Sequence, residues 1–375
     1  MHDAGFTGGD SLNWTEERDR LITLALSTGW CAAGTTTPDP FLNAEEHLLD
    51  ALKEGRLTGM PWMHEQRAHA STHLADRFPW AQSIIALAWP YSPHSTSNPT
   101  APERTGRIAA YALLQDGNED RPEDYHPLLE RKCQELVREL HHSFPDLRTK
   151  IFVDHGWAVD RAIAERAGIG FIGKNACLIT QHGGSFVLLA AIVTSLPFPP
   201  TPPSRKSCGS CRTCIDSCPT GAILSPGVID ARKCISYWTI EHAGPVPEHI
   251  RPLIGEWVFG CDLCQDVCPI NVRKALPQNR HAGSSPAHHV DLIELLSLDE
   301  ESFTTQFGKT PIGRTGLERF LRNVIIALGN VGTLSALPHL EKYRAHASED
   351  HMELCTWAAH TIQQRATEAP TLPLH

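Results

Sequence analysis

The sequence predicts three regions of different fold class: an α/β amino-terminal domain with a central sheet, a cysteine-rich module, and a short carboxyl-terminal α-helical region resembling HEAT repeats. Three observations support this division. Apolar runs alternate with amphipathic segments before residue 197, cysteines cluster between residues 208 and 268, and helical spacing dominates the end of the chain. The expected boundaries are therefore 1–196, 197–290 and 291–375.

The first region contains both kinds of periodic segment. Helices are predicted over 15–27, 43–53 and 127–142, with Asn43 and Glu46 placed as a capping pair. Strands are predicted over 83–89, 150–153 and 186–194, which are short runs rich in Ile, Val, Leu or Phe. Such alternation favours a sheet covered by helices. The stretch 92–106 is polar and rich in Pro and Ser, so a loop is expected there.

Two proline-rich or polar stretches delimit the cysteine module. The sequence PFPPTPPSRKS at 197–207 cannot continue a helix or a central strand, and a second polar stretch occupies 277–289. Beyond it, GLERFLRNVIIALGNVG, ALPHLEKYRAH and HMELCTWAAHTIQQR read as helices that resemble one to one and a half HEAT-type repeats. So short an array should pack on the cysteine module, because solenoids need neighbouring repeats for stability.

The cysteine spacing is the strongest chemical signal. Residues 208–219 read CxxCxxCxxxCP and residues 261–269 read CxxCxxxCP. In bacterial ferredoxins, the first three cysteines of such a run bind one [4Fe–4S] cluster and the fourth binds the other. Cluster one is therefore assigned Cys208, Cys211, Cys214 and Cys268. Cluster two is assigned Cys218, Cys261 and Cys264, and Cys234, the only other cysteine of the module, is assigned as its fourth ligand.

Zinc is the alternative, because four cysteines also bind structural zinc, but three closely spaced cysteines followed by Cys-Pro are less typical of it. Twelve cysteines without a secretory leader argue for a reduced, cytoplasmic protein with metal sites rather than disulfides. Cys31, Cys133, Cys177 and Cys355 are interpreted as small buried hydrophobic residues. No apolar run approaches the ~20 residues of a membrane span, so no membrane association is expected.

Several stretches together resemble the epoxyqueuosine reductase family. They are DYH at 124–126, VD at 153–154, ERAGIGFIGKN at 165–175, CISYWTIEH at 234–242, FGCDLCQDVCP at 259–269 and LRNVIIALGN at 321–330. The resemblance implies a base-off cobalamin fed by the two clusters. It also implies a tRNA anticodon-loop substrate, whose epoxide at the wobble base is reduced to an alkene, with Asp154 as the proton donor.

The same resemblance implies which residues contact the cofactor. These are Arg77, His126, Asp154, Lys174, Asn175, Ser236 and Asp262. Four of them have a simpler interpretation: Arg77 and Lys174 as surface charges, Ser236 as a turn residue, and Asp154 as the cap of a helix that follows it. The segment LLQDGNEDRPE at 113–123 is longer and more acidic than the family pattern, and Ala190, Ala191 and Ala243 also depart from it.

The net charge of −10 excludes a generally basic nucleic-acid coat but permits a local basic face. Such a face is expected on the carboxyl-terminal helices and just after the last cluster cysteine, at Lys309, Arg314, Arg319, Arg322, Arg273, Lys274 and Arg280. An external low-potential electron donor and a monomeric state are also expected. Two other function classes stay open: a corrinoid iron–sulfur reductase of a small molecule, similar to a dehalogenase, and a non-enzymatic ferredoxin-like carrier or RNA-binding protein.

Overall fold

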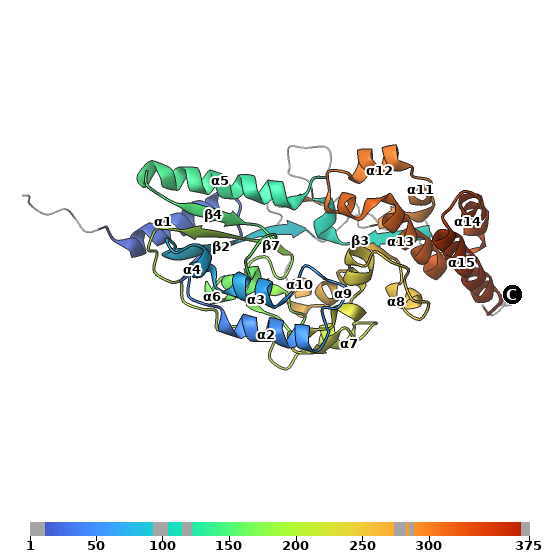
Figure 1. Ribbon diagram of the computed structural model, residues 1–375, viewed down its shortest axis with the longest axis horizontal. Helices are drawn as coiled ribbons and strands as arrows, with labels where there is room; N and C mark the ends of the chain where they lie inside the picture. Colours follow the sequence, from blue (N-terminus) through green and yellow to red (C-terminus); the bar gives the residue numbers. More distant parts are fainter. Residues whose placement is uncertain (1–11, 93–103, 115–121, 274–282, 285–288, 369–375) are drawn as a thin grey trace, which may run out of the picture.

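The computed structural model of the 375-residue chain describes residues 12–92, 104–114, 122–273, 283–284 and 289–368. Figure 1 shows an elongated molecule with the main sheet at one end and the helices of the carboxyl-terminal region at the other. The short cysteine-bearing helices lie between these two ends. The elongation follows from separate hydrophobic cores, with one on each face of the main sheet and another around the last helices.

The main sheet has the strand order β1-β2-β7-β4, and all pairs along this path are antiparallel. Its strands are β1 (Ala32–Thr36), β2 (Ser83–Ser92), β7 (Val187–Thr194) and β4 (Thr149–Phe152). A short strand, β11 (Gly283–Ser284), pairs in parallel with the end of β2. The sheet therefore gathers segments from the amino-terminal half and adds one from beyond the last cluster cysteine.

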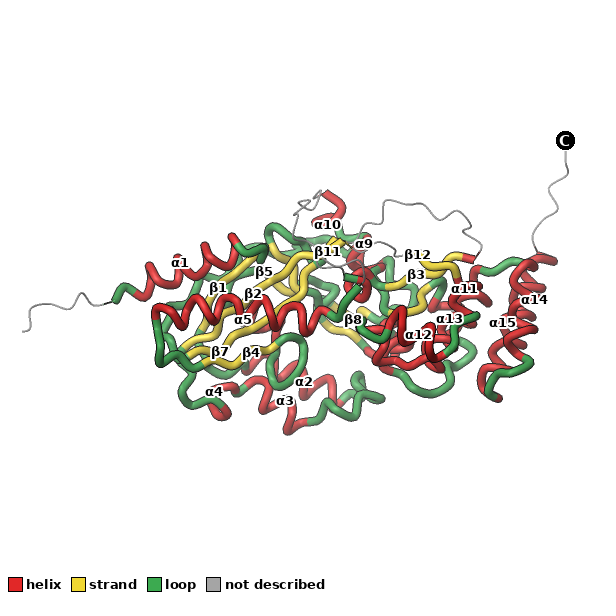
Figure 2. The backbone as a smooth tube through the Cα atoms, turned by 90° about the horizontal axis from the view of Figure 1, so that it is seen from above, coloured by secondary structure: helices red, strands yellow, loops and turns green. Residues whose placement is uncertain are grey.

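Residues alternate between the two faces of the sheet, as expected for strands. Ile85, Leu87 and Trp89 of β2 face a core shared with α1 (Trp14–Ser27) and α5 (Tyr125–Ser143). Ile84 and Ala86 face the opposite core, which includes residues of α4 (Leu74–Arg77) and α6 (Asp160–Arg166). Figure 2 shows α5 crossing over the sheet, and Figure 1 shows α2 (Leu42–Lys53) and α3 (Glu65–Thr72) on the side of the sheet opposite α5.

A second core joins parts of all three expected regions. The sheet β10-β3-β12 pairs β3 (Thr105–Ile108) with β10 (Trp257–Phe259) and β12 (His289–Asp291). Around this sheet pack α8 (Arg251–Ile254), α11 (Leu292–Leu296), α12 (Glu300–Phe307), α13 (Gly316–Val331), α14 (Leu337–Arg344) and α15 (Glu349–Glu368). The last helices thus share one core with the segment that follows the first cysteine run, as the shortness of the helical array predicts.

The cysteine-bearing segments form short elements. They are α7 (Thr213–Asp216), β8 (Ile223–Ser225), β9 (Val228–Ile229), α9 (Leu263–Asp266) and α10 (Pro269–Arg273). A single turn of π-helix, η4 (Tyr237–Glu241), follows Cys234. A two-stranded ribbon of β5 (Gly170–Ile172) and β6 (Leu178–Thr180) carries the GKN motif in its turn. The ribbon reaches from the main sheet toward the cysteines, because Phe171 and Ile179 pack with Cys268.

The predicted helices and strands of the amino-terminal region are confirmed to within three residues at either end. Two local predictions are wrong. Phe41, not Asn43, precedes the first turn of α2, and it makes no side-chain cap. Asp154 does not cap α6, which begins at Asp160 after Val159. Residues 93–103 of the predicted loop and most of 277–289 lie outside the described residues. Within the described residues, no helix is long and apolar enough to cross a bilayer.

Candidate iron–sulfur and active site

The two cysteine runs have the same backbone conformation. In the first, Cys218 N–H donates to the carbonyl of Ile215 and Asp216 N–H to that of Arg212, at 3.4 and 3.0 Å. In the second, Cys268 N–H donates to Gln265 and Asp266 N–H to Asp262, at 3.1 and 2.8 Å. Each run therefore makes one short helical turn and ends at a Cys-Pro. The two runs therefore repeat one local conformation as well as one cysteine spacing.

The cysteine side chains fall into two groups. Burial raises the pKa of Cys214, and the nearby thiols of Cys208, Cys268 and Cys211 raise it further. Burial likewise raises the pKa of Cys261, with added contributions from Cys234 and Cys218. Cys264 interacts with Cys261 and Cys234. The first group combines three cysteines of the first run with Cys268 of the second, and the second group combines Cys261 and Cys264 of the second run with Cys218 of the first run and Cys234.

Cys177 lies beside the second group, which the sequence analysis missed. Its thiol forms a hydrogen bond with that of Cys264. Cys133 and Cys355 are buried, in agreement with their interpretation as small hydrophobic residues. The only sequence signal for Cys177 was its position two residues after Asn175, in the segment GKNAC. A cysteine spaced this way carries no ligand motif, so its role depends on the fold.

Lys174 and Asn175 contact the backbone of both cysteine runs. The Lys174 ammonium donates to the carbonyls of Gly209 and Cys211, each at 2.8 Å. The Asn175 amide donates to the carbonyl of Cys264 at 3.3 Å, and its oxygen accepts from the N–H of Cys177. Asn175 is only 3% exposed. The turn of the β5-β6 ribbon therefore fixes the two runs relative to the sheet domain.

Asp154 follows β4 in a left-handed backbone conformation, with φ of 49°. A non-glycine residue in this region stores backbone strain, which often occurs at functional sites. Its carboxylate accepts a hydrogen bond from the hydroxyl of Tyr125, the first residue of α5. Tyr125 is buried, whereas the Asp154 side chain faces solvent. Asp154 can therefore meet a bound substrate while a buried phenol orients it.

The rest of the DYH motif connects this site to the carboxyl-terminal region. His126 Nδ1 lies 2.6 Å from Asp124 Oδ1, and the Arg314 guanidinium lies 3.6 Å from the other Asp124 oxygen. Partial burial opposes ionisation of Asp124, but the hydrogen bonds from His126 and the charge of Arg314 lower its pKa overall. The His126 ring stacks between Tyr125 and His155. Arg314 belongs to the 3-10 turn η5 (Pro311–Thr315).

The loop after Asp154 rests on two arginines. Arg67 of α3 donates to the carbonyl of Gly156 at 2.7 Å, and its guanidinium lies 5.4 Å from the ring centre of Trp157. Arg77 lies 5.0 Å from the same ring. Arg77 is thus placed beside the aspartate loop by a cation–π contact. Sequence reasoning selected Arg77 but not Arg67, whose contact partner is 89 residues away.

Two further carboxyl groups lie close to the site, Asp262 buried and Asp160 partly buried. Burial and the charge of Asp154 raise the pKa of Asp160 to about 8, and its Oδ1 atom has no hydrogen-bond partner among the described residues. Burial raises the pKa of Asp262 to about 7, although it accepts hydrogen bonds from the Ala110 N–H and the Gln265 amide. Next to Cys234, the Ser236 hydroxyl makes a hydrogen bond with the cysteine sulfur.

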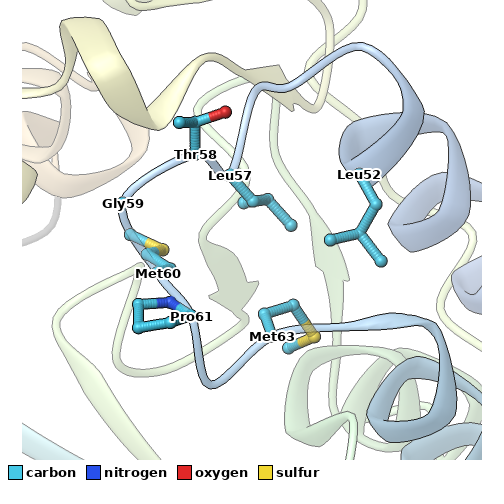
Figure 3. A pocket seen from close by; sticks show the side chains of 7 residues that line it. All are labelled: Leu52, Leu57, Thr58, Gly59, Met60, Pro61 and Met63. Atoms are coloured by element: carbon cyan, nitrogen blue, oxygen red, sulfur yellow. The ribbon is translucent and has the colours of Figure 1, made fainter.

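An apolar pocket of about 560 Å³ lies on the segment that joins α2 to α3. Figure 3 shows the side chains of Leu52, Leu57, Thr58, Met60, Pro61 and Met63 around it. Gly59 of the same segment has φ of 93° and approaches the Tyr237 hydroxyl so closely that a Cβ atom would collide with it. The pocket wall therefore meets η4, the element that follows Cys234 and Ser236.

The expected basic face is smaller than the sequence suggests. Arg322 is only 4% exposed and donates to the carbonyls of Trp238, His242 and Gly244. Arg319 donates to the carbonyl of Ile240 at 2.6 Å. Lys309 and the side chain of Arg314 are exposed. Lys274, Arg280 and the side chain of Arg273 lie outside the described residues.

Family models match two parts of the chain. Residues 72–155 match the family described as epoxyqueuosine reductase QueG, DUF1730, and residues 207–271 match the 4Fe-4S double cluster binding domain. The first match includes Arg77, the DYH motif and Asp154. The second includes all eight cysteines assigned to the clusters.

Curated relatives and solved structures match almost the whole chain. The epoxyqueuosine reductase of Xanthomonas campestris pv. campestris is 34% identical, over 92% of this chain and 96% of that relative, and that of Bacillus subtilis is 36% identical, over 88% and 83%. A structure of the Bacillus subtilis enzyme, with its catalytic aspartate loop swung out of the active site, superposes with a TM-score of 0.83 at 31% identity, covering 96% of both chains. A structure of epoxyqueuosine reductase with an epoxyqueuosine-modified tRNA-Tyr stem loop has the same TM-score and coverage at 32% identity.

Proposed function

The chain belongs to the epoxyqueuosine reductase family, and from this premise we propose that it reduces epoxyqueuosine in tRNA to queuosine. It is an oxidoreductase that carries a 4Fe-4S double cluster domain. The reaction takes two electrons and two protons: both carbon–oxygen bonds of the epoxide break, an alkene forms, and the oxygen leaves as water. The observation that carries the proposal is the aspartate on a strained turn, held by a buried tyrosine in the same molecule as eight grouped cysteines.

We assign the cluster ligands as two sets, each of which combines cysteines from both runs. Cluster one takes Cys208, Cys211, Cys214 and Cys268, and cluster two takes Cys218, Cys234, Cys261 and Cys264. The electrostatic coupling of Cys214 with Cys268, and of Cys261 with both Cys218 and Cys234, supports this division. The donor set is thiolate throughout, which suits iron–sulfur clusters. The clusters would pass single electrons, received from an external low-potential donor.

We propose base-off cobalamin as the further cofactor. The unpartnered, buried Oδ1 of Asp160 fits such a group, because the amide side chains of a corrin offer N–H donors. Arg77, His126, Asp154, Ser236 and Asp262 would contact it, while Lys174 and Asn175 would hold the cysteine runs that border it. When bound, cobalamin supplies a low-potential metal centre that accepts electrons from the clusters.

We propose Asp154 as the proton donor to the departing oxygen. Tyr125 fixes one oxygen of its carboxyl group, so the other is free to face the substrate. Asp154 is exposed in this structure, and a bound nucleotide would remove it from water and favour its protonated form. Asp160 holds a proton near neutral pH and interacts with Asp154, so it is a suitable reserve of protons behind it.

For the tRNA, we propose that exposed cations near the active site bind phosphates of the anticodon arm. The wobble base would turn out of the anticodon loop into the active site. Arg314 is the best placed, since it is exposed and contacts Asp124 of the DYH motif. We further propose that α13, α14 and α15 are a HEAT-like unit that shapes this surface. The protein would act as a monomer in the cytoplasm, where its tRNA substrate is found.

The decisive experiment is an anaerobic turnover assay. Protein with reconstituted clusters and added cobalamin is incubated with epoxyqueuosine-containing tRNA and a low-potential reductant. Nucleosides from the digested tRNA are then analysed by mass spectrometry. Conversion to queuosine, with loss of one oxygen atom, supports the proposal. Unchanged epoxyqueuosine, in a preparation with full iron and bound corrin, would reject it in favour of a small-molecule substrate.

A further inference from the structure

Three metal-binding side chains meet outside the site described above. Glu45 lies on α2, His69 lies on α3, and His73 is the residue that immediately follows α3. The His69 and His73 rings stack with their centres 4.0 Å apart. One ligand atom from each residue lies within 4.8 Å of the other two. Glu45 and His73 are largely buried, with 17% and 15% of their side chains exposed, whereas His69 is open to solvent.

The hydrogen bonds of His73 leave one ring nitrogen available. Its Nδ1 lies 3.1 Å from the carbonyl oxygen of His69 and 3.0 Å from the Thr72 hydroxyl oxygen. The Thr72 hydroxyl donates its own hydrogen to the carbonyls of Ala68 and His69, so both neighbours of Nδ1 can accept. Nδ1 therefore carries the proton, and the lone pair is on Nε2, 3.8 Å from Glu45 Oε2. A backbone carbonyl that fixes the tautomer in this way is typical of histidines that bind metals.

The remaining distances also fit a metal site. His69 Nδ1 lies 2.8 Å from Glu45 Oε1, and its other nitrogen faces Asp76 Oδ2 at 3.9 Å. Ligands about 2.0–2.1 Å from a tetrahedral zinc ion are about 3.3 Å from one another, a value between the 2.8 and 3.8 Å observed here. Two imidazoles and one carboxylate form a donor set that zinc favours, with water in the fourth position.

We propose that Glu45, His69 and His73 bind one Zn²⁺ ion that joins α2 to α3. These helices flank the segment that lines the apolar pocket. Helix α3 also carries Arg67, whose guanidinium holds the Gly156 carbonyl in the aspartate loop. The ion therefore joins the beginning of α2 to the end of α3 and restrains the helix on which the aspartate loop rests. The donor atoms of this site are nitrogen and oxygen rather than thiolate sulfur. Zinc binding here does not depend on the proposed reaction.

The test measures zinc in the protein with both clusters in place. Cluster-loaded protein is dialysed anaerobically against micromolar Zn²⁺ and then against metal-free buffer, and iron and zinc are counted by mass spectrometry. We expect one tightly held zinc per chain in addition to the full iron content. Glu45→Gln, which keeps the side-chain shape, and His69→Ala, at an exposed position, should each lose it without loss of iron.

His142→Ala is the matched control. His142 lies 3.7 Å from Glu139 on α5, an exposed histidine–carboxylate pair that belongs to no group of three metal-binding side chains among the described residues, so this variant should retain the zinc. X-ray absorption then identifies the ligands: nitrogen and oxygen at about 2.0 Å support the site, whereas sulfur at about 2.3 Å places zinc on cysteines and rejects it. Absence of bound zinc, or full zinc in Glu45→Gln and His69→Ala, overturns the proposal.

Discussion

Tyr125 and Asp154 are joined by a hydrogen bond from a buried phenol to an exposed carboxylate on a left-handed turn. Twenty-nine residues separate them along the chain, yet each lies at the edge of an element: Tyr125 opens α5 and Asp154 follows the end of β4. Burial and the charge of Asp154 raise the pKa of Tyr125, so the phenol stays a donor at every physiological pH. The pair is therefore a fixed donor–acceptor unit.

Variants of this pair should separate chemistry from positioning. Asp154→Asn removes the proposed acid and should lower kcat at least about 100-fold, because general acids typically contribute that much. Tyr125→Phe removes only the orienting hydrogen bond and should lower kcat about 10- to 100-fold. Both should keep full iron content. The control is Tyr343→Phe, because the Tyr343 hydroxyl interacts with His351 and not with the aspartate loop. Its kcat should be unchanged. Near-normal turnover of Asp154→Asn would reject its role as proton donor.

Cys234→Ala should lose one cluster and keep the other. Cluster two would have three thiolates left, whereas the four ligands of cluster one are untouched. Iron analysis should fall from about eight to about four atoms per chain, the content of one cubane. Cys133→Ala, at a buried cysteine in the core between α5 and the sheet, is the control and should keep all its iron. Full iron in Cys234→Ala would show that another residue is the fourth ligand.

Cys177→Ala should lower the reduction potential of cluster two. Once iron binds Cys264 as a thiolate, the hydrogen of the Cys177–Cys264 bond must come from Cys177, and such a donor stabilises the more negative, reduced cluster. Loss of this hydrogen bond, with a contribution of about 0.5–1.5 kcal/mol, corresponds to a decrease of about 20–60 mV in the one-electron reduction potential. Anaerobic redox titration followed by electron paramagnetic resonance measures it. Cys31→Ala should leave both potentials unchanged, and an unshifted cluster in Cys177→Ala would contradict the hydrogen bond's role.

Two arginines that look equivalent in sequence should behave differently. Arg314→Gln should weaken tRNA binding and reduce the dependence of log affinity on log salt by about one unit, without affecting stability. Arg322→Gln should instead destabilise the protein by about 3–5 kcal/mol, because the buried carbonyls of Trp238, His242 and Gly244 lose their donor. Binding titrations at several salt concentrations and thermal unfolding measure the two effects. Normal stability of Arg322→Gln would indicate that this buried network is not formed.

Asp160 predicts a specific pH dependence of stability. In the folded protein its pKa is about 8, whereas an unfolded aspartate titrates near about 3.9. At pH values between these two pKa values, Asp160 is protonated in the folded state and ionised in the unfolded chain. The free energy of unfolding therefore falls as the pH rises from the lower pKa to the higher one. Asp160→Asn removes the penalty and should gain stability relative to the native protein between pH 5 and pH 8. Thermal unfolding at both pH values measures this, with the exposed Asp50→Asn as control. A pH-independent difference would show that Asp160 is already ionised.

The sequence alone determined the elements whose pattern is local. The short apolar runs of residues 83–89 and 186–194 predicted β2 and β7, and the runs are continuous because both faces of these strands are buried. The spacing within 208–219 and 261–269 predicted two equivalent cysteine runs, because consecutive ligands there are set by one helical turn. The motifs DYH and VD also led to His126 and Asp154, whereas the role of Tyr125 emerged only from its contact with Asp154.

Only the tertiary structure decided which distant residues meet. Nothing near Cys177 in the sequence indicates its bond to Cys264, and nothing near Arg322 indicates that three carbonyls of residues 238–244 consume its donors. The same holds for Glu45 with His73, and for β3, which pairs with β10 across about 150 residues. Periodicity reports which face of an element is buried, but it does not name the partner. Which residues become partners depends on how whole helices and sheets pack against one another, because each distant contact forms only when the contacts around it form as well.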